Sequence, residues 1–120
     1  MSESCESFLE RVAAPTPTPG GGTVSAVCGA LSVALSRMVA NLAVGKQGYE
    51  AVQAYLAAIE ARGKALQARF LELADADARA YESVVAAMRR PKGTDAEKAA
   101  RKDAMQAAYK QAQVEVQEKA

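Results

Sequence analysis

The stretch from Pro15 to Lys46 constrains the fold of this chain more than any other. It begins with prolines that alternate with threonines, passes through three consecutive glycines and continues as a long apolar segment. Prolines hold a backbone extended, whereas glycines allow angles and close approaches that a side chain forbids. The pattern predicts a turn that leads into a buried helix, with Thr23 or the last glycine as the cap. The free N–H groups of such a helix attract anions, although a turn of this kind more often binds nothing.

The helix after this turn is predicted over residues 23–44. Its larger apolar residues recur at intervals of three and four, which places them in one stripe: Val24, Val27, Cys28, Leu31, Leu35, Met38 and Leu42. Alanines and glycines make up much of the remaining surface, so we place this helix at the centre of a bundle. Gly45 would end the helix, and Lys46 would lie in the negative field of that end. Asn41 either bonds a neighbouring carbonyl group, which its type favours, or contacts a ligand.

Three further helices are predicted, and the sequence favours helix throughout. A short helix at residues 3–13 would serve as a lid or dimer contact. A very long one at residues 49–89 contains no proline, and Gly63 is its one weak point. The last helix would begin at Thr94, with Glu97 as its capping-box partner, and would run to about residue 117 with a thin apolar face in a peripheral position. The expected fold class is an all-α bundle with one long helix, completed by oligomerisation.

The long helix carries one acidic residue in an unusual place. At about 100° per residue, Asp77 lies roughly 20° from Leu66 and Val84, inside the apolar stripe, whereas Asp75 points to the opposite side. A buried carboxylate must be paired, hydrogen-bonded or protonated, and these are conditions under which carboxylates act as catalytic acids or bases. Periodicity leaves two interpretations equally open. Asp77 is a catalytic group, or it forms a salt bridge to a cation of another helix.

Composition excludes several classes of function. The 15 basic and 14 acidic residues nearly balance, which argues against a nucleic-acid-binding protein. The absence of histidine excludes a Ser-His-Asp triad and histidine-based metal sites. The glycine clusters fit neither a P-loop nor a dinucleotide fingerprint. Two cysteines without metal-type spacing, no signal peptide and no expected membrane span indicate a soluble, cytoplasmic protein. Acid–base chemistry on an organic substrate remains, with no metal and no cofactor.

Three ordered segments carry a resemblance to a known family. The segments PTPTPGGGTVSA, MVANLAVGKQGYE and LADADARAYESVV resemble motifs of the cyclodeaminase family, which comprises formiminotetrahydrofolate cyclodeaminases and the related methenyltetrahydrofolate cyclohydrolases. The resemblance extends from Phe8 to about Ala112. It implies an all-helical fold, assembly as dimers or larger, and a folate-binding cleft near the subunit interface. The cyclodeaminase converts 5-formiminotetrahydrofolate to 5,10-methenyltetrahydrofolate with loss of ammonia, and the cyclohydrolases interconvert the methenyl and 10-formyl forms.

The resemblance also assigns roles to individual residues. The family's glycine turn corresponds to Pro19, Gly20, Gly21 and Gly22, followed by Thr23, and its second motif corresponds to Asn41, Leu42, Gly45 and Lys46. Its acidic pair corresponds to Asp75 and Asp77. Asp77 would take the proton from N10 of the folate as general base, and Lys46 would donate to the leaving nitrogen or stabilise charge. The glycine turn and Asn41 would hold the pterin or the formimino group. Lys46 is equally interpretable as a cation that stabilises a helix end.

The family's members continue with further helices beyond the point where this sequence stops. We therefore expect residues 1–120 to form a single domain that is shorter than the family's at its C-terminal end. Another subunit would cover the apolar faces left over, or they would stay exposed. The expected partners are a folate substrate and further copies of the chain, with neither nucleic acid nor membrane. The alternatives to a cyclodeaminase are a methenyltetrahydrofolate cyclohydrolase and a non-catalytic helical assembly module.

Overall fold

The computed structural model describes residues 2–119, and its regular elements in this range are all helical. They are α1 (Cys5–Ala13), α2 (Gly21–Ala43), the short 3₁₀ helix η1 (Glu50–Val52), α3 (Gln53–Met88) and α4 (Asp95–Lys119). The all-α class and the order of the four predicted helices are therefore confirmed. The long helix begins four residues later than predicted because residues 50–52 form the 3₁₀ turn that leads into it.

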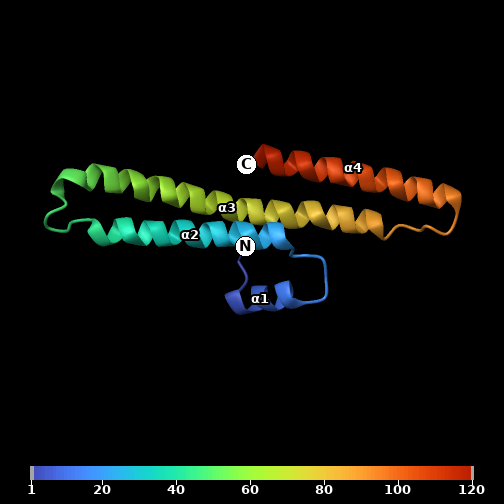
Figure 1. Cartoon of the computed structure of the whole chain (residues 1–120), viewed down its shortest axis with the longest axis horizontal. Coiled ribbons are helices and arrows are strands. Elements are labelled where there is room, and N and C mark those ends of the chain that lie inside the picture. The colour runs from blue at the N-terminus through green and yellow to red at the C-terminus, as the bar shows by residue number, and fades with distance from the viewer. Residues whose placement is uncertain (1, 120) are drawn as a thin grey trace.

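Helix α3 is the central element of the chain. Its 36 residues make it about 54 Å long. Helix α2 lies antiparallel along its N-terminal part, and α4 lies on the opposite side along its C-terminal part (Figure 1). Within this chain the central position thus belongs to α3, and not to the small-residue helix α2 as predicted.

Small residues allow α2 and α3 to lie close together. A Cβ atom added at Gly29 would lie 2.6 Å from the ring of Phe70, and one added at Gly63 would lie 2.7 Å from Cγ of Arg37. Ala30 is also buried in this contact region of α2. Gly63, predicted as a possible bend, is therefore a point of close approach in a helix that continues through it.

Polar side chains fix the register of the two helices. Arg37 donates from Nη2 to Oε1 of Glu60 at 2.6 Å and from Nη1 to Oε1 of Gln67 at 2.7 Å. Asn41 donates from Nδ2 to Oε2 of Glu60 at 3.1 Å. The hydrogen bond from Arg37 is the main reason that the pKa of Glu60 lies below its ordinary value. Asn41 therefore bonds a carboxylate of the neighbouring helix, where a carbonyl group was expected.

The larger apolar side chains of α2 point away from α3. Leu31, Leu35, Met38 and Leu42 expose 61%, 61%, 51% and 69% of their surface. The predicted apolar stripe is consequently an open face in this chain. By length and composition alone, α2 could also span a membrane.

The other two helices differ in how firmly they pack. Helix α4 packs against α3, and its start agrees with the sequence: the N–H of Glu97 donates to Oγ1 of Thr94 at 3.1 Å, which confirms the predicted beginning of α4. Ala108 of α4 packs with Val84 and Ala87 of α3 in a buried cluster. The buried residue of α1 is Phe8, and α1 lies on the side of α2 opposite α3 (Figure 1). The whole chain is extended, measuring 74 × 29 × 17 Å.

Candidate functional site

The glycine turn forms the beginning of α2. Gly20 is the N-cap in an extended conformation, and no side chain caps the helix. The helix therefore begins two residues earlier than predicted, and neither Thr23 nor the last glycine is the cap. Pro19, which precedes the turn, is buried and follows a cis peptide bond. The turn thus presents backbone N–H groups at the positive end of α2.

Asp77 of α3 lies directly against this first turn. A Cβ atom at Gly22 would lie 2.6 Å from both of its carboxylate oxygens. The hydroxyl group of Thr23, a residue only 3% exposed, donates to Oδ2 of Asp77 at 3.1 Å and lies 3.4 Å from the carbonyl oxygen of Ala74. The first turn of α2 contains no acidic residue of its own. Asp77 therefore brings a negative charge to the positive end of that helix, which stabilises the arrangement.

A hollow of about 300 Å³ opens beside this carboxylate. It is lined by Pro17, Gly20, Gly21, Gly22, Asp77 and Tyr81. Asp77 is half-buried, so the expectation of full burial was too strong, and Asp75 is half-buried too, where full exposure was expected. Pro17 and Tyr81 are the two lining residues that the sequence analysis did not assign to the site. For Tyr81, the position one helical turn after Asp77 is the signal that indicates it.

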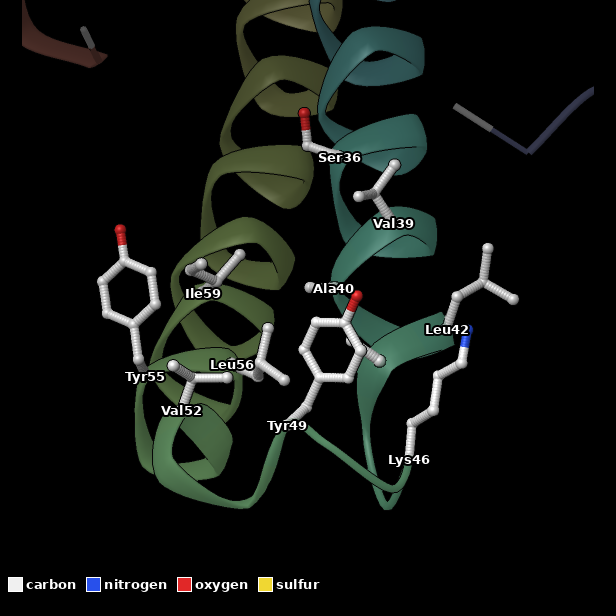
Figure 2. A pocket seen from close by; sticks show the side chains of 11 residues that line it. Ser36, Val39, Ala40, Leu42, Lys46, Tyr49, Val52, Tyr55, Leu56 and Ile59 are labelled. Carbon is white, nitrogen blue, oxygen red and sulfur yellow. The ribbon is translucent and has the colours of Figure 1, made fainter.

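The second group of predicted site residues lies at the other end of α2. Lys46 follows the helix in the turn before η1, and its Nζ lies 5.9 Å from the centre of the Tyr49 ring. A hollow of about 730 Å³ opens here between α2 and the start of α3 (Figure 2). Its lining is mainly apolar: Ser36, Val39, Ala40, Leu42, Ala43, Lys46, Tyr49, Val52, Tyr55, Leu56 and Ile59. In Figure 2, Lys46 extends beside Leu42, away from α3.

The length of α2 separates the two groups. Its 23 residues span about 35 Å, with Asp77 at the beginning and Lys46 beyond the end. Gly20, Gly21, Gly22, Thr23 and Asp77 therefore come together in one chain, whereas Asn41 and Lys46 do not join them. The first group can hold a polar substrate beside an oriented carboxylate. The second group offers a cation beside an apolar hollow.

Comparisons with known proteins agree with one another. A family described as formiminotransferase-cyclodeaminase matches residues 4–116. The chain is 40% identical over 111 residues to a methenyltetrahydrofolate cyclohydrolase of Methylorubrum extorquens, covering 92% of this chain and 53% of that protein. It is 34% identical over 112 residues to a formimidoyltransferase-cyclodeaminase of Sus scrofa, covering 93% of this chain and 21% of that protein.

A solved structure gives the same result. The crystal structure of a formiminotetrahydrofolate cyclodeaminase from Thermotoga maritima matches with a TM-score of 0.75 and 33% identity, covering 95% of this chain and 52% of that one. The chain thus spans about half the length of the bacterial relatives it matches. At this identity and TM-score, the likeness covers both the sequence and the arrangement of the helices.

Proposed function

Because this chain belongs to the formiminotransferase-cyclodeaminase family, we propose that it closes the one-carbon bridge of a tetrahydrofolate. The substrate would be 5-formiminotetrahydrofolate, and the products would be 5,10-methenyltetrahydrofolate and ammonia. The observation that carries this proposal is the carboxylate of Asp77, held by the Thr23 hydroxyl at the edge of an open hollow. Such a carboxylate is a suitable general base because it is oriented and accessible.

The proposed reaction requires two proton transfers. N10 of the folate attacks the carbon of the protonated formimino group (C=NH2+), so that a new N–C bond forms and the C=N double bond becomes single. Asp77 takes the proton that N10 loses. The bond between that carbon and the formimino nitrogen then breaks, and the nitrogen leaves as ammonia after it has received a proton. The N–H groups of Gly20, Gly21 and Gly22 and the ring of Tyr81 would hold the substrate beside the base.

The proton for the leaving nitrogen would come from Lys46. Within one chain Lys46 lies about 35 Å from Asp77, since the length of α2 separates them. We therefore propose that the protein works as a homo-oligomer and that Lys46 reaches the hollow from a second copy. The open apolar face of α2 supports this, because an exposed face of that kind is typical of an interface.

A second candidate is methenyltetrahydrofolate cyclohydrolase, which the relative at 40% identity favours. In that reaction water adds to the bridging carbon of 5,10-methenyltetrahydrofolate. The bond from that carbon to N5 then breaks, and the proton of the added hydroxyl group goes to N5, which gives the 10-formyl form. Asp77 would then take a proton from the water. Both reactions place the same carbon beside the same carboxylate, so the site is compatible with either.

Turnover assays distinguish the two reactions. The purified chain is incubated with 5-formiminotetrahydrofolate, or with 5,10-methenyltetrahydrofolate, while methenyl absorbance and ammonia are measured. Absorbance that rises with equimolar ammonia supports the cyclodeaminase, and absorbance that falls without ammonia supports the cyclohydrolase. Asp77→Asn should abolish either activity, whereas Asp103→Asn, which removes an exposed charge from α4, should not. A wild-type protein that is inactive and also fails to bind folate would contradict both enzyme proposals and favour the non-catalytic assembly module.

A further inference from the structure

The turn that carries Lys46 has a sequence that leaves its backbone many choices. It comprises residues 44–49 and joins α2 to η1. Gly45 and Gly48 have positive φ angles of 69° and 93°, a region that glycine enters without steric cost. A short turn with two such glycines can adopt many conformations when nothing holds it. Contacts from outside the turn must therefore select the conformation that the structure shows.

The side chain of Gln53, the first residue of α3, makes such contacts. Its Oε1 accepts from the N–H of Gly45 at 3.0 Å. Its Nε2 donates to the carbonyl oxygen of Ala43 at 3.2 Å and to that of Tyr49 at 3.1 Å. Gln53 is half-buried, and its amide group donates and accepts at once. One side chain thus fastens the end of α2, the beginning of the turn and the end of the turn to α3.

The residues that Gln53 holds are those that Lys46 contacts. The N–H of Lys46 donates to the carbonyl oxygen of Ala43 at 3.2 Å, and its own carbonyl oxygen accepts from the N–H of Tyr49 at 3.2 Å. Nζ of Lys46 lies 5.9 Å from the centre of the Tyr49 ring, within the range of a cation–π interaction. Both the main chain and the ammonium group of Lys46 therefore contact residues that Gln53 bonds.

Capping of α2 alone does not account for these bonds. The last carbonyl groups of a helix need partners, and the bond from Gln53 to Ala43 meets that need. Gly45 and Tyr49, however, lie beyond α2, which ends at Ala43. The two bonds to them restrict the turn and add nothing to the helix. Gln53 also does not line the hollow beside Lys46, so it has no direct route to a substrate there.

We propose that Gln53 is a positioning residue, which fixes the turn so that the side chain of Lys46 starts from one defined point. The inference deepens the proposed function and rests on it, because the step it serves is the passage of a proton from Nζ of Lys46 to the leaving nitrogen. A proton donor that is already in place reacts faster than one that must first find its position. The contribution of Gln53 should therefore appear in kcat and not in KM.

The variant Gln53→Met tests the proposal, with Gln67→Met as its matched control. Methionine keeps the length of the side chain but removes the donor and all but a weak acceptor. Gln67 is also a half-buried glutamine of α3, and it accepts from Nη1 of Arg37 in α2. Both variants should melt at a lower temperature than the wild type. Only Gln53→Met should lower kcat, by about tenfold or more, with KM within about twofold of the wild-type value.

Two NMR measurements test the same placement without turnover. The amide proton of Gly45 should lose its protection from exchange with solvent in Gln53→Met, because its acceptor is gone. The ε-methylene protons of Lys46, whose chemical shift depends on the nearby ring of Tyr49, should shift toward the position of a free lysine. Neither signal should change in Gln67→Met.

Three results would overturn the proposal: a wild-type kcat in Gln53→Met, an equal loss of kcat in the two variants, or a Gly45 amide whose exchange stays unchanged. The proposed function can fail separately. NMR changes as expected in a protein that shows no turnover would contradict the proposed function and confirm that Gln53 holds the turn. Turnover that continues at full kcat in Gln53→Met would leave the proposed function standing and remove Gln53 from it.

Discussion

The carboxylate of Asp77 occupies the space that a side chain at Gly22 would fill. An added Cβ atom there would lie 2.6 Å from both carboxylate oxygens, whereas one added at Gly21 would meet nothing within 4 Å. The third glycine of the turn is therefore needed for the approach of α3 to α2. The three glycines look equivalent in the sequence, but the structure gives Gly21 and Gly22 different roles.

Alanine substitutions at these two glycines should have different effects. Gly22→Ala forces the carboxylate of Asp77 away from the helix end and should lower kcat/KM about tenfold or more, equivalent to about 1.4 kcal/mol of transition-state stabilisation. Gly21→Ala adds the same methyl group to open space and should stay near wild type. The measurement is steady-state turnover, with circular dichroism to confirm folding. Equal losses in both variants would indicate that the glycines serve the ligand and not Asp77.

The hydroxyl group of Thr23 should be required for catalysis although it does not face the substrate. Thr23→Val keeps the shape of this buried side chain but removes the donor to Asp77, and the loss of one such hydrogen bond is worth about 1–3 kcal/mol. We expect a lower kcat with little change in KM, because the hydrogen bond holds the carboxylate in the orientation that the reaction needs. Thr23→Ser restores the donor and should recover most of the activity. A valine variant with an unchanged kcat would reduce Thr23 to a packing role.

Mixed dimers test whether Asp77 and Lys46 act across two copies. Asp77→Asn and Lys46→Met should each be inactive alone. When the two proteins are unfolded together and refolded as an equal mixture, about half of the dimers are mixed, and each mixed dimer contains one hollow with both native groups. Activity should therefore return to about a quarter of the wild-type value. If both residues acted from the same chain, no mixture would regain activity.

The pairing of Arg37 with Glu60 predicts a loss of stability in acid. The pKa of Glu60 is lowered from 4.5 in the folded chain, mainly by the hydrogen bond from Arg37. A carboxyl group with a lowered pKa stabilises the fold above its unfolded pKa, and this contribution is lost as the pH falls through the folded pKa. The wild-type melting temperature should thus fall between about pH 5 and pH 3 more steeply than that of Glu60→Gln. Parallel curves for the two proteins would contradict a role of the pair in stability.

The helices themselves could be predicted from sequence because their signals are local. The cap at Thr94 and the glycine turn each mark the beginning of a helix, the first at the expected residue and the second two residues early. The placement of Asp77 beside a neighbouring helix also follows from periodicity. The exposed fractions of Asp75 and Asp77 could not be predicted in this way, because the prediction assumed a single apolar stripe on α3. That helix contacts α2 on one side and α4 on the other, so it has two inward faces.

The orientation of α2 could not be predicted from its pattern. Both of its faces are apolar, and hydrophobicity alone favours burial of the larger residues. The small-residue face packs within the chain because Gly29 and Gly63 admit Phe70 and Arg37 at distances that any side chain would prevent. The separation of Lys46 from Asp77, by contrast, follows from the length of the helix once the contact between Asp77 and Gly22 is known. To predict which face of α2 packs on α3, one would need to know which residues of the two helices are in contact, and the sequence pattern does not contain this.

The position of α3 between α2 and α4 has a consequence for how the protein opens. Helix α4 packs through the cluster of Val84, Ala87 and Ala108 at one end, while the contact between Gly22 and Asp77 belongs to the α2 side. In the described part of the chain, α2 and α4 each contact α3 extensively and make at most slight contact with each other. Helix α4 can therefore detach in a local, partial unfolding event that exposes little of the α2 contact. The chain behaves as two cooperative units that share one helix, and amide hydrogen exchange should be faster in α4 than in α2 and in the part of α3 that contacts α2.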